Sequence, residues 1–183
     1  NCIRLTTLCE HIWGCRTANG WDINGFKQLK DGRGNICPVT IILPTIAMQA
    51  KESYHPELGD DLVGVFMVKL MNKIDEAKDM LIERFNYIAS QSPDAAKFMY
   101  ENGTMEGYIP EEGIISALKH GTLAVGQIGL AETLEILIGC NHTTEKGMKF
   151  AKEIEYIFKS KCQKFKEEYK LNFGVYYTPE YNI

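Results

Sequence analysis

The sequence lacks the features that mark membrane and secreted proteins. Among its 183 residues, no apolar run approaches the roughly 20 residues that a membrane-spanning helix needs. The first residues, NCIRLTTLCEHIW, do not have the basic and then apolar layout of a signal peptide. We therefore expect a cytoplasmic protein with no membrane partner.

Positive charge is also scarce. The 20 Lys and Arg residues against 24 Asp and Glu residues give a formal net charge of −4. We expect no nucleic-acid partner, because binding a phosphodiester backbone needs a basic surface. A few well-placed groups can still bind a single nucleotide, because local contacts rather than net charge decide that.

The six cysteines favour neither a disulfide framework nor a zinc site. The chain is longer than the small secreted scaffolds that depend on disulfides. It also contains no C-x-x-C pair, so we expect no metal site within it. Most of these thiols are expected to be buried as small apolar residues.

Apolar patterning predicts three strands separated by helices. The strands are PVTIIL (38–43), which we expect Pro44 to end, TLAVGQIG (122–129) and NFGVYY (172–177). Amphipathic spacing predicts helices over 60–90, 94–101, 111–118 and 130–138, and a long helix that follows Asn141 and Thr143 as caps and reaches Tyr169. This order is typical of an α/β fold, with the strands mostly parallel in one sheet and the helices outside it. Three strands make an incomplete barrel, so we expect part of a larger fold.

Cys15 stands among closely spaced glycines in GCRTANGWDINGF. A loop thiol without a role is the ordinary interpretation, because a reactive cysteine needs an environment that spacing cannot reveal. The functional interpretation is a thiol held at a loop tip, where Gly14 allows a tight turn and Arg16 lies beside it.

Several motifs in one order resemble the catalytic subunit of the anaerobic (class III) ribonucleotide reductases. They are G-C-R-T (14–17), G-R-G-N (32–35), P-V-T-I-I-L-P (38–44), ALKHGTLAVGQIGLAETLEILIG (117–139) and LNFGVYYTP (171–179). The resemblance implies a glycyl-radical enzyme with a ten-stranded α/β barrel, mostly parallel strands and long outer helices. Residues 1–183 would form part of that catalytic domain, with the cysteine finger loop and first strand in 1–44 and the helices and two further strands in 45–183.

The resemblance also implies the activity, which is reduction of ribonucleoside triphosphates by thiyl and glycyl radical chemistry. Cys15 matches the thiyl cysteine and Asn35 a substrate-binding asparagine, although Asn35 can equally form a local turn after Gly34. Gly14 and Arg16 are further substrate-site candidates. Glu132 is a weaker one, because a carboxylate in the first turn of a helix is favoured electrostatically in any case.

The implied cofactor and partners lie outside the chain. The glycyl radical would sit on a segment resembling R-V-C-G-Y, which is absent here, and an S-adenosylmethionine iron–sulfur activase would install it. The family's four-cysteine zinc site is also absent. The full-length subunit is expected to be a homodimer, and we expect this piece to be inactive alone.

Other residues are interpreted as structural. His120 is expected to be a strand-entry histidine rather than an acid–base group. Cys37 is expected to be an inert strand-edge thiol rather than a redox partner. Glu180 stands in T-P-E-Y where the family has T-P-A-E, and whether it replaces the family's glutamate stays open.

Two other functions compete with the reductase. One is a non-catalytic binding or assembly module that keeps the barrel scaffold. The other is a glycyl-radical lyase of the pyruvate formate-lyase type, against which G-R-G-N argues.

Overall fold

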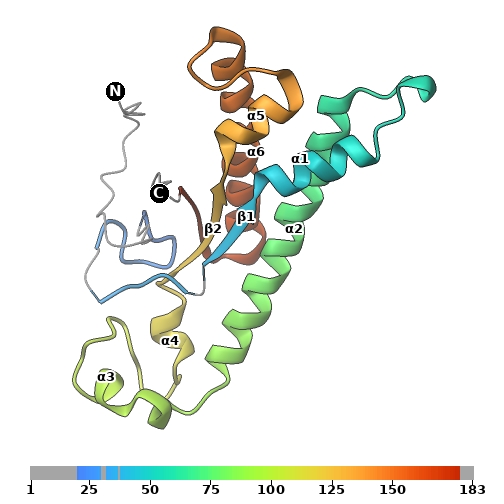
Figure 1. Cartoon of the computed structure of the whole chain (residues 1–183). Helices are drawn as coiled ribbons and strands as arrows, with labels where there is room; N and C mark the ends of the chain where they lie inside the picture. Colours follow the sequence, from blue (N-terminus) through green and yellow to red (C-terminus); the bar gives the residue numbers. More distant parts are fainter. Residues whose placement is uncertain (1–19, 30–31, 37, 178–183) are drawn as a thin grey trace.

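The computed structural model describes residues 20–29, 32–36 and 38–177 (Figure 1). Their centre is a sheet of three strands, β1 (Val39–Ile42), β2 (Thr122–Ile128) and β3 (Asn172–Tyr177). The order in the sheet is β1-β2-β3, and both neighbouring pairs are parallel. The three predicted strands and their parallel pairing in one sheet are therefore confirmed.

The two longest helices in the described part of the chain are the ones that the amphipathic spacing predicted. They are α2 (Leu62–Ala89) and α6 (Glu145–Tyr169). The shorter elements are α1 (Leu43–Glu52), η1 (Pro56–Leu58), η2 (Pro93–Ala96), α3 (Lys97–Glu101), α4 (Ile115–Leu118) and α5 (Leu130–Ile138). No helix in the described part of the chain is both long and apolar enough to cross a membrane.

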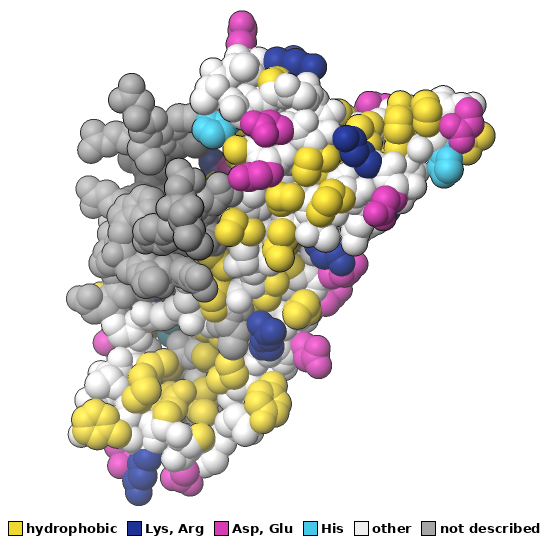
Figure 2. Space-filling model, in the orientation of Figure 1, with side chains coloured by type: hydrophobic (Ala, Val, Ile, Leu, Met, Phe, Trp, Pro, Cys, Tyr) yellow, Lys and Arg dark blue, Asp and Glu magenta, His cyan; other side chains and the backbone are white. Residues whose placement is uncertain are grey.

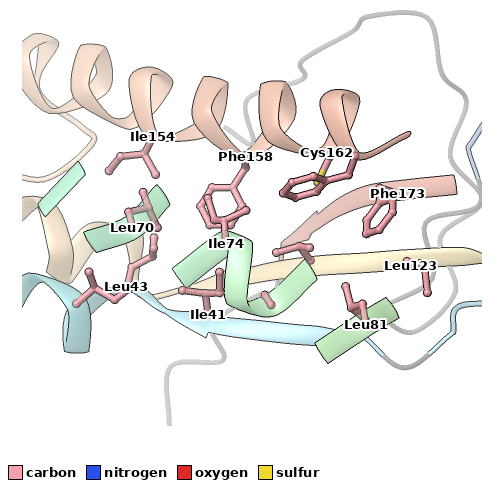
Figure 3. Packing of buried hydrophobic residues seen from close by; sticks show 14 of the residues in the cluster. Ile41, Leu43, Leu70, Ile74, Leu81, Leu123, Ile154, Phe158, Cys162 and Phe173 are labelled. Carbon is pink, nitrogen blue, oxygen red and sulfur yellow. The ribbon is translucent and has the colours of Figure 1, made fainter. Parts of the chain in front are cut away.

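The hydrophobic core lies between α2, α6 and one face of the sheet (Figure 3). Alternate strand residues point to this face, and Ile41, Leu123 and Phe173 join the core from the three strands. Phe158 of α6 and Ile74 of α2 meet them and are fully buried. Burying a side chain of this size stabilises the fold by about 1.5–3 kcal/mol, so this layer holds the helices to the sheet.

The first strand ends earlier than the sequence predicted. Pro44 does not follow the strand but occupies the first turn of α1, which begins at Leu43. Proline is well suited to that position, because its fixed φ is helical and the N–H it lacks would have no partner inside the helix. Our interpretation of Pro44 as a strand terminator therefore missed the ten-residue helix α1.

Two other helix starts differ from the prediction. The helix expected over 111–118 is confirmed only for Ile115–Leu118, because the preceding residues form a turn in which Gly113 has a φ of +74°. The cap of α6 is Thr144, whose hydroxyl accepts a hydrogen bond from the Gly147 amide at 3.1 Å. The predicted caps were wrong because Asn141 is engaged in a turn of its own with Thr143.

Candidate active site

The main catalytic candidates cannot be placed in the fold. Gly14, Cys15 and Arg16 lie outside the described residues, and so do Cys37 and Glu180. The described chain begins at Gly20, five positions after Cys15 in the sequence. The described part of the candidate site consists of the loop that follows Cys15 and the sheet that this loop contacts.

A buried carboxylate fixes the loop of residues 20–29 to the sheet. Asp22 is 1% exposed and accepts hydrogen bonds from the amides of Asn24 and Phe26, both at 2.9 Å. It also accepts one from Asn172 Nδ2 and one from His120 Nδ1, both at 2.7 Å. Burial by itself raises the pKa of Asp22, but these hydrogen bonds outweigh it and hold the pKa below its ordinary value.

His120 is enclosed at the entrance to β2. Its side chain is buried, and its ring is stacked on Phe26 with 3.7 Å between the ring centroids. Because an ionised carboxylate can only accept, the Nδ1 atom of His120 carries the hydrogen that bonds to Asp22. His120 thus lies at the entry to β2, which begins at Thr122, as the sequence predicted.

Arg33 binds both ends of the same loop. Its Nε atom donates to the carbonyl of His120 at 2.6 Å. Its Nη1 atom donates to the carbonyls of Gly20 and Leu29, at 3.1 and 2.6 Å. The two ends of the loop are therefore held against the residue that leads into β2.

Asn172, the first residue of β3, completes the network. Its Oδ1 atom accepts the amide of Ile23 at 3.0 Å. The neighbouring Asn24 donates from Nδ2 to the carbonyls of Lys119 and Lys170, at 2.9 and 3.2 Å. Sequence reasoning missed this network, because its members are up to 150 positions apart.

Asn35 continues the sheet beyond the amino end of β1. It forms a parallel bridge with Thr122, and the amide of Thr122 donates to the carbonyl of Gly34 at 2.9 Å. Partners in a parallel ladder share a face, so Asn35 lies on the face that also carries Ala124 and Gly126. That face is turned away from α2 and α6.

The same face carries a pair of hydroxyl groups. The ring of Tyr176 lies over Gly126 of the central strand, and its hydroxyl is hydrogen-bonded to the hydroxyl of Thr40 on β1. The bond crosses β2 and joins the two outer strands. The hydroxyl pair makes this part of the face polar.

The candidates Asn35 and Glu132 are not brought together. Asn35 lies at the amino end of β2, whereas Glu132 is exposed in the first turn of α5, beyond the carboxyl end. A strand of the length of β2 separates its ends by roughly 20 Å. The two candidates therefore lie at opposite ends of the central strand.

A half-buried acid lies at the carboxyl end of the sheet. Glu155 of α6 accepts hydrogen bonds from the side chains of Gln127 and Tyr177. Burial raises the pKa of Glu155, and burial together with this carboxylate raises the pKa of Tyr177. No sequence motif predicted this cluster, because its three members come from separate elements.

Among the described residues, no group of three or more His, Cys, Asp or Glu side chains is placed to hold a metal ion. The two described cysteines, Cys140 and Cys162, are both free thiols. Burial raises the pKa of Cys162 to about 12, as expected of a thiol that packs in the core.

Comparison with known proteins gives this fold a family. The family model described as anaerobic ribonucleoside-triphosphate reductase matches residues 8–182. The chain belongs to this family. The resemblance drawn from the sequence motifs is thereby confirmed.

Curated anaerobic ribonucleoside-triphosphate reductases match nearly the whole chain. The Escherichia coli protein is 27% identical over 187 residues, which cover 99% of this chain and 25% of that protein. The protein of Enterobacteria phage T4 is 27% identical over 175 residues, covering 93% of this chain and 26% of that protein. The chain thus spans about a quarter of the length of the curated relatives it matches.

Solved structures of anaerobic ribonucleotide reductases share the fold. The Thermotoga maritima enzyme with glycerol in its active site has a TM-score of 0.60 at 20% identity, covering 91% of this chain and 24% of that one. The same enzyme in complex with dATP and CTP has a TM-score of 0.60 at 19% identity, covering 79% and 22%.

Proposed function

We propose that this chain is part of the catalytic subunit of an anaerobic ribonucleoside-triphosphate reductase, and that the whole protein makes deoxyribonucleoside triphosphates. The observation that carries the proposal is the family match over residues 8–182, which includes the G-C-R-T motif at 14–17. The solved relative in complex with dATP and CTP supports nucleotides as ligands.

In this proposal Cys15 is the catalytic residue. As a thiyl radical it takes the 3′ hydrogen of the ribose, so that an S–H bond forms as the C–H bond breaks. The 2′ hydroxyl leaves as water, and formate or a dithiol protein supplies the two electrons and the protons that complete the reduction. Cys15 then returns the hydrogen to C3′. The protein contributes mainly by holding sulfur and ribose in register.

The remaining site residues have supporting roles in the proposal. Gly14 allows the turn that presents the thiol, and Arg16 pairs with the triphosphate. Asn35 donates to the substrate from the face of the sheet turned away from the helices. Glu132 lies at the far end of β2 from Asn35 and is the weakest member of the set.

The glycyl radical that the family implies supplies the unpaired electron from another part of the polypeptide. One observation supports such an arrangement: Ile42, on the sheet face opposite α2 and α6, is 58% exposed. We propose that this face lines the inside of a ten-stranded barrel. A radical activase of the S-adenosylmethionine iron–sulfur class and a homodimeric cytoplasmic enzyme complete the proposal.

The decisive experiment compares two cysteines in the full-length protein with its activase. Cys15→Ser should still form the glycyl radical, detected by electron paramagnetic resonance, but should make no deoxyribonucleotide. The stronger O–H bond of serine makes an oxygen-centred radical inaccessible. Cys162→Ser is the control, because this thiol lies in the core, and it should keep both signals. Turnover by Cys15→Ser would reject the thiyl assignment, whereas a wild-type protein that makes no deoxyribonucleotide would favour the non-catalytic module.

A further inference from the structure

The Asp22 carboxylate is buried and joins three segments of the chain, yet the proposed chemistry makes no use of it. Its partners His120 and Asn172 lie 98 and 150 positions away and lead into two neighbouring strands. Burying an ionised carboxylate is unfavourable unless hydrogen bonds replace its lost water. Here they do, with each carboxylate oxygen accepting one main-chain and one side-chain hydrogen bond.

Such a network fixes geometry more strictly than apolar packing does. Hydrogen bonds to a charged acceptor are short and directional, so the loop has one favourable position against the sheet. Arg33 adds to this by binding both ends of the loop, at Gly20 and Leu29. The loop of residues 20–29 is consequently attached at its middle and at both ends.

The attachment point lies close to Cys15 along the chain. Seven peptide units separate Cys15 from Asp22, and seven residues span at most about 25 Å when fully extended. Any shift of the loop against the sheet therefore moves the point at which residues 15–19 join the described chain. A misplacement of about 1 Å at a reacting centre can cost roughly a hundredfold in rate.

We propose that Asp22, His120 and Asn172 form a positioning anchor for Cys15, and that His120 serves the reaction through Asp22 rather than as an acid–base group. The inference rests on the proposed function. The anchor fixes the loop of residues 20–29 at the amino end of the sheet. The chain that leads back from this loop to Cys15 then keeps the thiol within reach of the ribose.

The first test is Asp22→Asn in the full-length protein. The side-chain amide of the new asparagine places its own N–H group opposite hydrogen-bond donors that now bind the carboxylate. The loop should therefore separate from the sheet. With the activase, the yield of glycyl radical should be unchanged, KM should stay within about twofold, and kcat should fall about tenfold or more. In the protein without radical, alkylation of Cys15 by iodoacetamide, followed by mass spectrometry, should become about tenfold faster.

A pair of variants at His120 tests the hydrogen bond itself. His120→Asn keeps an N–H donor close to the place of Nδ1, whereas His120→Leu fills the space without a donor. We expect His120→Asn to retain most of the wild-type kcat and His120→Leu to behave like Asp22→Asn. Equal loss in both variants would reject the positioning role.

Asp61→Ala is the matched control, since Asp61 also accepts two main-chain amides, at the start of α2. It should lower the thermal midpoint but leave kcat and Cys15 alkylation unchanged. If Asp22→Asn and His120→Leu resemble this control, the network is only structural and the inference is wrong. Should Asp22→Asn fail to fold, the His120 pair decides. Alkylation needs no turnover, so it tests the anchor even if Cys15→Ser disproves the proposed function.

Discussion

Tyr176 lies flat over Gly126, and this contact requires that the central strand have no side chain there. A Cβ atom at Gly126 would overlap the tyrosine ring, which is itself only 6% exposed. The ring reaches across β2 to Thr40 because the glycine leaves a channel between the outer strands.

Gly126→Ala should therefore destabilise the full-length protein by about 1–3 kcal/mol, the usual cost of overpacking. The midpoint of thermal unfolding should fall accordingly. Gly34→Ala is the control, because nothing lies within 4 Å of a Cβ built at Gly34. The contact would be less restrictive than we infer if both variants unfolded at the same temperature.

Acid should weaken the attachment of the loop that contains Asp22. An aspartate in an unfolded chain has a pKa of about 3.9, and the pKa of Asp22 in the fold is lower. Its contribution to stability is thus fully present above about pH 4 and is lost as the pH falls through the folded value. The thermal midpoints of wild type and Asp22→Asn should converge over that range. A constant difference down to about pH 2 would contradict the lowered pKa.

Cys162 should be unreactive in the native protein. With a pKa of about 12, only about one thiol in ten thousand is ionised at pH 8, and only the thiolate attacks alkylating agents. Iodoacetamide should modify the half-buried Cys140 at least about a hundredfold faster than Cys162, as measured by peptide mass spectrometry. Similar rates would show that α6 opens readily from the core.

The isolated chain of 183 residues should self-associate. In the described sheet β1 and β3 each have one unpaired edge, and Figure 2 shows apolar side chains gathered around α3, where Phe98 is 72% exposed. Unpaired edges and apolar patches favour association. Sedimentation should show mass rising with concentration, and Phe98→Lys should reduce the effect. A strictly monomeric species over a wide concentration range would contradict this prediction.

The strands and long helices were predictable because each carries its own periodic signal. The spacing from Leu62 to Ile88 indicates one buried helix face without any knowledge of its partners. Helix α1 was missed because Pro44 was taken only as a terminator, although proline also starts helices.

The polar network at the amino end of the sheet could not have been predicted in the same way. Nothing local distinguishes Asp22 in W-D-I-N-G from an ordinary turn aspartate, and its two strand partners are defined only once the sheet exists. The positions of Asn35 and Glu132 at opposite ends of β2 likewise depend on strand register.

The long separation between Asp22 and Asn172 also sets an order of events during protein synthesis. A ribosome adds about 5–20 residues per second, so the 150 positions between them take roughly 8–30 s to be made. Throughout that time the loop has been synthesised but lacks one of its partners. The loop of residues 20–29 is consequently among the last parts of this region to reach its final position, well after the first strand has been translated.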